Sequence, residues 1–254
     1  MFVATFAIMK GGHRSLLVPN FPLVILRGLL LACASMLFYL AAAAMNFPEA
    51  VAMYFTMPLL VTITAGIILR EHVPLYRWSA VALGLIGVLA IVRPGTALFE
   101  PITLVAFAAA LCYALGNVLT RSLSTSVQIA PLAFWQSSMY VAVALLLSAL
   151  FGSGRLHFTG HVSLDYLTRG WIWPTAFDFL LIVALGFTTA ILMLLFVTAY
   201  KLAESSFVAP FEYSAMFWAV LFSFLIWHEW PTPHALAGIA LIVASGLFLA
   251  IRDR

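Results

Sequence analysis

Charge is the property that this sequence has least of. Only 8% of its 254 residues are Asp, Glu, Lys or Arg, whereas 65% are hydrophobic, and the mean hydropathy is +1.11. A water-soluble domain of this size needs a far more polar surface, so the composition predicts an integral membrane protein. The net charge of +3 is carried by loops and forms no basic patch interleaved with aromatic residues, which excludes nucleic acid as a partner.

Cysteine and catalytic motifs are almost equally scarce. The two cysteines, Cys33 and Cys112, lie inside apolar runs, so no disulfide framework is indicated. The chain lacks a Gly-x-Ser-x-Gly motif, paired membrane aspartates and a phosphate-binding loop. His157 and His161 have the spacing of a metal pair, but they lie in an outer loop without a matching acid or a third ligand. We therefore expect no enzyme activity, no ATP, no cofactor and no bound metal.

Long apolar runs are what the sequence has instead. Runs of roughly 18 to 25 residues have the length that an α-helix needs to cross a hydrocarbon core of about 30 Å, whereas barrel strands are about ten residues long and alternate in polarity. The sequence therefore predicts an all-α polytopic membrane protein, a helical bundle with eight complete spans. These spans are Phe21 to Ala44, Glu49 to Leu69, Trp78 to Val92, Ile102 to Thr120, Ala130 to Phe151, Thr175 to Tyr200, Ser205 to Trp227 and His234 to Ile251.

Lysine and arginine fall mostly on one side of these spans. Cytoplasmic loops carry the excess of these cations, so the loop at Lys10 is placed inside. Nine of the 12 cations then lie on or near the inner face, and only Arg93, Arg155 and Arg169 lie outside. The C-terminus is therefore predicted to be cytoplasmic.

One stretch, Phe38 to Val92, occurs twice in outline. The stretch contains, in order, an acidic connection, an apolar run, a Glu, a Pro-bearing turn and a helix rich in small residues. The same order returns 158 positions later, so that Phe196 aligns with Phe38. A fixed offset of this kind indicates an internal duplication. An odd number of crossings separates the copies, so the second copy is inverted, as in many secondary transporters. We predict a first repeat over residues 1–95, with about three helices, and a second, with five, over residues 96–254.

The first repeat is shorter than the second. Two spans precede the duplicated unit in the second half, whereas the first half has only the apolar stub Met1 to Met9, which is too short to span. Two further helices are therefore expected upstream, either because the chain is truncated or because Met1 is an internal start. A version that evolved with eight helices is the third alternative.

With its duplication, the spacing from Pro58 to Glu71 and the helix with Gly84 and Gly87, the chain resembles the EamA family of the drug/metabolite transporter superfamily. The resemblance covers essentially the whole chain and implies a ten-helix inverted-repeat fold, of which eight complete helices are present. Family members commonly end the fourth and ninth helices in Gly-Glu. Here Arg70 and His228 replace the Gly.

The second repeat departs further from the family pattern. Met216 stands where the family has Pro, and the proline has moved to Pro210 in the sequence Ala-Pro-Phe-Glu-Tyr. This variant resembles a branch that carries bulky organic metabolites such as S-adenosylmethionine or riboflavin. The resemblance implies a carrier in the bacterial inner membrane that works by alternating access. The expected partners are a small-molecule substrate, the lipid bilayer and, as one candidate, a second copy of the chain in a homodimer.

Glu212 is the most informative single residue. It lies seven residues into the helix predicted from Ser205, about 10 Å deep at 1.5 Å per residue. An ionised carboxylate at this depth costs roughly 2.5 to 3.5 kcal/mol unless it faces a cavity or a partner. Two interpretations stay open: Glu212 binds substrate or a coupling proton, or it is a protonated structural residue.

Arg27 is predicted to lie at a similar depth, six residues into the first span from the same inner face. The favoured interpretation is that its long side chain extends to the lipid headgroups. The alternative is a cation in a cavity, paired with Glu212 or with an anionic substrate.

Further candidates lie inside the spans. Tyr54 and Tyr213 stand beside Pro58 and Pro210 in the two repeats, where kinked helices free backbone carbonyls. Polar side chains also interrupt two apolar runs. The predicted substrate-binding residues are Arg27, Tyr54, Pro58, Asn117, Gln136, Pro210, Glu212 and Tyr213.

The preferred function is a secondary transporter of small organic metabolites, coupled to protons if Glu212 titrates. A membrane scaffold without a transport path is the first alternative, and an intramembrane enzyme is the second. A scaffold needs no carboxylate near the midplane, so access of water to the Glu212 helix distinguishes it from a carrier. The missing nucleophile motifs count against the enzyme.

Overall fold

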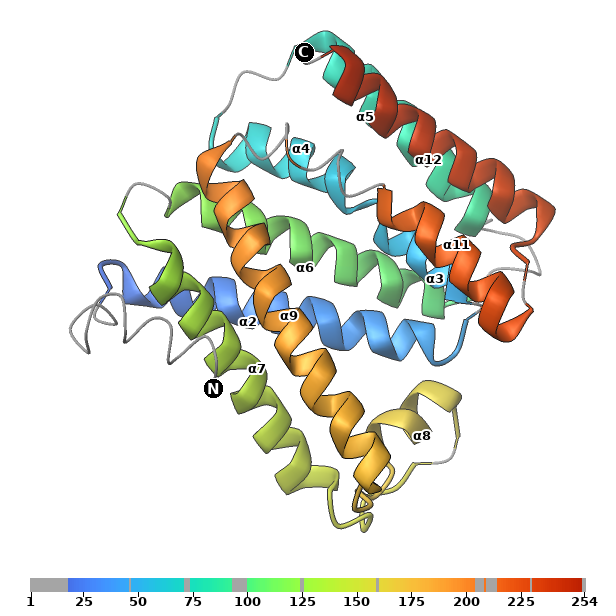
Figure 1. Cartoon of the computed structure of the whole chain (residues 1–254). Helices are drawn as coiled ribbons and strands as arrows, with labels where there is room; N and C mark the ends of the chain where they lie inside the picture. The colour runs from blue at the N-terminus through green and yellow to red at the C-terminus, as the bar shows by residue number, and fades with distance from the viewer. Residues whose placement is uncertain are drawn as a thin grey trace. The chain divides into compact units, whose positions relative to one another are not determined.

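The computed structural model describes residues 18–45, 47–70, 74–92, 100–123, 126–158, 160–203, 208, 214–228 and 230–252. Regular secondary structure in these ranges is entirely helical (Figure 1). The helices are α2 (Phe21–Ala42), α3 (Phe47–Tyr54), α4 (Met57–Ile68), α5 (Leu75–Val92), α6 (Ile102–Ser122), α7 (Ile129–Phe151), α8 (Val162–Thr168), α9 (Ala176–Leu202), α11 (Ser214–Trp227) and α12 (Pro233–Arg252).

Every apolar run predicted from the sequence contains at least one of these helices. Five helical stretches of the described residues are long and apolar enough to cross a membrane, and shorter apolar helices cover Leu75–Ile91 and Pro233–Phe248. The chain is therefore an all-helical membrane protein, as the composition predicts, while the number of eight spans and the inverted repeat stay predictions. Helix α8 is a difference, because the sequence predicts a loop over the whole of Gly152 to Pro174.

The second predicted span, Glu49 to Leu69, is divided into α3 and α4. Thr56 stands at the break. Its N–H donates to the Met53 carbonyl at 3.2 Å, and its hydroxyl donates to the same oxygen at 2.9 Å. Pro58, in the first turn of α4, has no N–H with which to continue the hydrogen bonding of α3. The proline that predicts a kink thus follows a break between two helices.

Arg70 and His228, which stand where the family commonly has Gly, share an unusual backbone conformation. Their φ angles are 54° and 56°, in the left-handed region that glycine enters most easily. Each residue follows the end of an apolar helix, α4 or α11, which is where left-handed residues commonly occur. The two positions are 158 residues apart, which is the offset of the predicted repeat. At equivalent positions of the two predicted repeats, the residue that follows the helix thus has a left-handed φ angle, and neither residue is glycine.

The structure contains two compact units, of which the first comprises the described parts of Met1–Ala32 and Leu119–Ala203. Lys201, at the end of α9, donates from Nζ to the Val127 carbonyl at 2.9 Å and so ties α9 to the turn before α7. The apolar core of this unit is drawn from α2, α7, α9 and the turn between α6 and α7. Its buried members are Val24, Leu123, Val127, Leu132 and Val197.

The second unit comprises the described parts of Cys33–Val118 and Glu204–Arg254, and α5 and α12 pack along each other in it (Figure 1). Gly87 and Gly238 face each other at this contact. A Cβ on Gly87 would lie 2.7 Å from the Gly238 carbonyl oxygen, and a Cβ on Gly238 would lie 2.6 Å from that of Gly87. The small residues thus let two helix backbones approach closely.

Gly238→Ala should destabilise the second unit. The added Cβ meets a backbone oxygen that can move only if α5 moves, and overpacking of this kind costs roughly 1 to 3 kcal/mol. Gly186→Ala is the matched control, because a Cβ there has no described heavy atom within 4 Å and alanine favours the helix. Thermal unfolding of the detergent-solubilised proteins measures the difference. A melting temperature for Gly238→Ala equal to that of the control would show that α5 and α12 are not closely packed.

Candidate functional site

Arg27 is the largest fully buried side chain in the described part of the chain, with 1% of its surface exposed. It lies on α2, and its guanidinium contacts α6 and α7. Nε donates to Thr120 Oγ1 at 2.6 Å, Nη1 donates to the Leu132 carbonyl at 3.2 Å, and Nη2 donates to Gln136 Oε1 at 2.9 Å. A buried charge is costly unless it is hydrogen-bonded, so these oxygens are what makes the position tolerable.

A close approach of α2 to α7 brings Arg27 and Gln136 together, although they are 109 residues apart in the sequence. Gly28 lies at the contact. A Cβ on Gly28 would lie 2.7 Å from Met139 Cγ and 3.3 Å from the Trp135 carbonyl oxygen. The absence of that Cβ lets the two helices pack closely enough for the neighbouring Arg27 to reach Gln136.

The structure corrects the favoured interpretation of Arg27. Its tip does not extend to the lipid headgroups, because it is bonded to α6 and α7 inside the first unit. Gln136, another predicted residue, lies next to it, while Thr120 was missed. The signal was available: Tyr113, Asn117 and Thr120 are spaced i, i+4 and i+7, which puts them on one face of α6.

Aromatic side chains surround Tyr54, the last residue of α3, in the second unit. The Tyr54 ring lies 4.8 Å from that of Phe38 on α2 and 5.6 Å from that of Tyr113 on α6, between ring centroids. The Tyr54 and Tyr113 rings are edge to face, at an interplanar angle of 66°. All three side chains are half-buried. Sequence reasoning found Tyr54 and missed the other two, because nothing local predicts which rings of separate helices will meet.

Asn117 lies one turn after Tyr113 on α6, with only 5% of its surface exposed. Its Nδ2 donates to the Tyr113 carbonyl at 3.1 Å. Within the ranges that the structure describes, the carboxamide oxygen and the second N–H have no partner. A buried amide in this state is costly, which makes Asn117 able to bond a polar group brought by a ligand.

Of the four remaining predicted residues, the structure describes only Pro58. Pro58 lies in the first turn of α4. Pro210, Glu212 and Tyr213 lie outside the described residues, since α11 is described from Ser214 onward. Their roles stay predictions.

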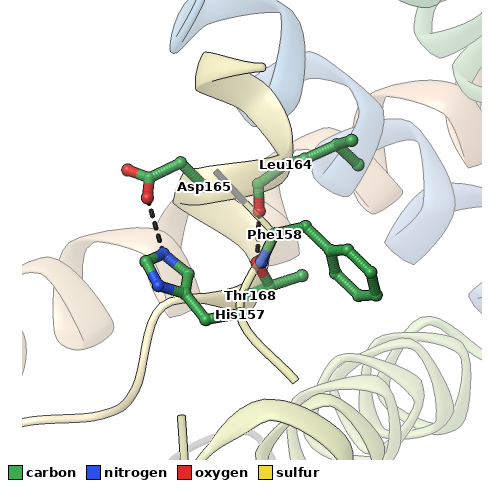
Figure 2. Close-up of polar contacts among 5 residues, drawn as sticks. All are labelled: His157, Phe158, Leu164, Asp165 and Thr168. Carbon is green, nitrogen blue, oxygen red and sulfur yellow. Dashed lines mark hydrogen bonds and ion pairs between the residues drawn. The ribbon is translucent and has the colours of Figure 1, made fainter. Parts of the chain in front are cut away.

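The two histidines of the segment between α7 and α9 form separate hydrogen bonds. His157 pairs through Nε2 with Asp165 Oδ1 at 2.6 Å (Figure 2). Beside this pair the Phe158 N–H donates to Thr168 Oγ1 at 2.9 Å, and the Thr168 hydroxyl donates to the Leu164 carbonyl at 2.7 Å. Asp165 is a matching acid that sequence reasoning missed, and these bonds tie the segment before α8 to the helix itself.

His161 has a separate task at the start of α8. Its Nδ1 accepts a hydrogen bond from the Ser163 N–H at 3.2 Å, so that it caps the helix. The residues that the structure describes contain no group of three or more His, Cys, Asp or Glu placed to hold a metal ion. Hydrogen bonds join the described residues of this segment.

Comparison with known proteins adds a family to this geometry. The EamA-like transporter family matches residues 1–93 and 101–251. The S-adenosylmethionine uptake transporter of Rickettsia prowazekii is 25% identical over 232 residues, covering 91% of this chain and 72% of the relative. The riboflavin transporter of Vibrio cholerae is 28% identical over 242 residues, covering 94% of this chain and 74% of the relative. One crystal structure, 21% identical, matches with a TM-score of 0.68 over 100% of this chain and 85% of its own, which shows a shared fold.

Arg27→Lys should lower the stability of the first unit. Lysine keeps a buried charge, but its single ammonium lacks the planar fork with which the guanidinium binds three oxygens at once. Lost hydrogen bonds at buried groups cost roughly 1 to 3 kcal/mol. Arg155→Lys, at an exposed loop position, is the matched control and should unfold like the parent protein. Equal melting temperatures for the two variants would show that the Arg27 contacts contribute nothing to stability.

Proposed function

Because this chain belongs to the EamA-like transporter family, we propose that it carries a small organic metabolite across the bacterial inner membrane by alternating access. The family match, which extends over residues 1–93 and 101–251, is the observation that carries this proposal. The apolar helical stretches support it by their length. The distribution of Lys and Arg supports a cytoplasmic C-terminus.

The substrate class that we propose is a metabolite with a planar heterocycle. The relatives are named for S-adenosylmethionine and for riboflavin, and both of these molecules contain such a ring. The rings of Phe38, Tyr54 and Tyr113 offer faces and edges against which a planar ring can pack. Asn117, one turn along α6, has an oxygen and an N–H available for the polar edge of that ring. The second unit thus has the chemistry to bind both parts of such a substrate.

The broken helix beside Tyr54 supports a role in transport. Secondary transporters commonly bind substrate where a membrane helix is interrupted, because the ends of the half-helices expose polar backbone groups. The break at Thr56 places helix ends among buried residues of the second unit. Irregular backbone at membrane depth is tolerated where it is covered by protein or lines a polar cavity.

Proton coupling through Glu212 is the remaining part of the proposal. Pro210, two residues earlier, cannot donate to a helix, so the backbone near Glu212 has polar groups to offer. At this depth the free-energy cost of burying the Glu212 side chain is low only when the carboxyl group is protonated, or when water or a cation reaches the ionised form. Changing between these states during transport would couple substrate movement to a proton.

A counterflow assay tests the carrier against the scaffold. Vesicles containing the purified chain are loaded with unlabelled riboflavin or S-adenosylmethionine and diluted into the same labelled compound at low concentration. A carrier exchanges one for the other, so we expect label to accumulate transiently inside above its outside concentration for at least one compound. Protein-free vesicles are the control. A channel gives equilibration without accumulation, and a scaffold gives no uptake; either result would contradict alternating access for these substrates.

Glu212→Gln should separate exchange from coupling. Glutamine keeps the shape and hydrogen bonding of the side chain but cannot release a proton. Net uptake driven by an inward proton gradient should therefore be lost, while counterflow at constant pH continues. Net uptake by this variant at the parent rate across pH 5 to 8 would show that Glu212 is structural and that coupling takes place elsewhere.

A further inference from the structure

Gln136 carries an unused pair of hydrogen-bond donors. Its side chain lies on α7 with 9% of its surface exposed, and its single hydrogen bond in the described part of the chain is the one from Arg27 Nη2 to Oε1, at 2.9 Å. Nε2 therefore has two N–H groups without a partner among the described residues. A buried donor in this state is destabilising, and an acceptor on a bound ligand would remove that cost.

The direction of these donors is fixed by the chemistry of Arg27. A guanidinium has five N–H donors and no acceptor, so only the oxygen of a carboxamide can face it. The reversed orientation would set N–H against N–H beside a positive charge. Arg27 itself is held at two other points, Thr120 Oγ1 at 2.6 Å and the Leu132 carbonyl at 3.2 Å. The Gln136 amide therefore cannot turn over while Arg27 stays in place.

The Leu132 contact strengthens this constraint. In an α-helix the Leu132 carbonyl is also the acceptor for the backbone N–H of Gln136, four residues later. Arg27 thus bonds both to the side chain of Gln136 and to the carbonyl that holds its backbone. The Gln136 side chain is thus held at its carboxamide and at its backbone. It loses little further conformational freedom when it binds a ligand, which favours tight and selective recognition.

We propose that Arg27 acts as a positioning residue that turns the two Nε2 protons of Gln136 toward an accessible binding position in the first unit, where they bind a hydrogen-bond acceptor of the substrate. This proposal rests on the proposed transport function and adds a chemical requirement to it. The matching group is a carbonyl oxygen, an unprotonated ring nitrogen or a carboxylate. An ammonium group is rejected there, because it has only donors and would stand near the Arg27 charge.

The first test needs no knowledge of the substrate. Gln136→Cys and Ala133→Cys are made in a background in which Cys33 and Cys112 are replaced by alanine. Both sites lie on α7, but Ala133 has 0% of its surface exposed. Folded protein in vesicles is treated with a small anionic methanethiosulfonate, which reacts where water reaches the thiol. We expect Gln136→Cys to react at least tenfold faster; equal rates would overturn the proposal, because the position would be closed to ligands.

The second test uses Gln136→Glu, which keeps the side-chain shape and an oxygen facing Arg27 but replaces the two donors by a second acceptor. Transport of riboflavin and of S-adenosylmethionine is measured for this variant and for the parent. We expect the KM of the transported compound to rise about tenfold or more, as for the loss of one ligand hydrogen bond, with the maximal rate within about threefold. An unchanged KM, or a change in maximal rate alone, would overturn the proposal.

Arg27 variants test the positioning role. Arg27→Lys keeps a donor opposite Oε1 and should keep the KM within about threefold of the parent value, whereas Arg27→Met frees the carboxamide to turn and should raise the KM as Gln136→Glu does. The same KM for both variants would contradict a positioning role. If the parent carries neither compound, the substrates named under the proposed function are wrong, and the thiol-labelling result alone decides the proposal for Gln136.

Discussion

A guanidinium inside an apolar helical bundle has to be surrounded by oxygen atoms, and this requirement decides how part of the chain packs. Arg27 stays charged at any physiological pH, so it cannot lower the cost of burial by losing a proton. Its three bonds reach a hydroxyl on α6, a carbonyl of α7 and a carboxamide of α7. Helix α6 contributes one of these three points and α7 contributes two. The packing of α2 on α7 through Gly28 is what makes those points coincide.

Polar backbone groups at helix ends inside a membrane also need hydrogen-bond partners from the protein, because no water is available there. At the break that precedes Pro58, the N–H and the hydroxyl of Thr56 both donate hydrogen bonds to the Met53 carbonyl. Arg70 and His228 adopt left-handed φ angles where α4 and α11 stop. That conformation costs a residue with a Cβ roughly 1 to 2 kcal/mol of free energy, a cost that glycine does not have.

The sequence predicts most of the helices, because a run of apolar residues long enough to span leaves few alternatives. It also identifies Arg27 and Gln136 separately, since polar side chains are conspicuous within apolar runs. Their contact could not be predicted, because it depends on the approach of helices 109 residues apart. Thr120 and Tyr113 lie on the same face of α6 as Asn117, so the sequence carries a signal for them but not for the helices that they meet. Hydroxyls and rings are common in membrane helices, and only the position of a neighbouring helix gives one of them a role.

The two compact units cut across the two predicted repeats. In the first unit α2, from the first predicted repeat, packs with α7 and α9 from the second. In the second unit α3 packs with α11 and α12, and α5 packs with α12. Helices α2 and α6 contribute residues to both units. The Arg27 contacts belong to the first unit and the Tyr54 rings to the second. Because α2 and α6 each run through both units, neither unit is formed by one predicted repeat alone.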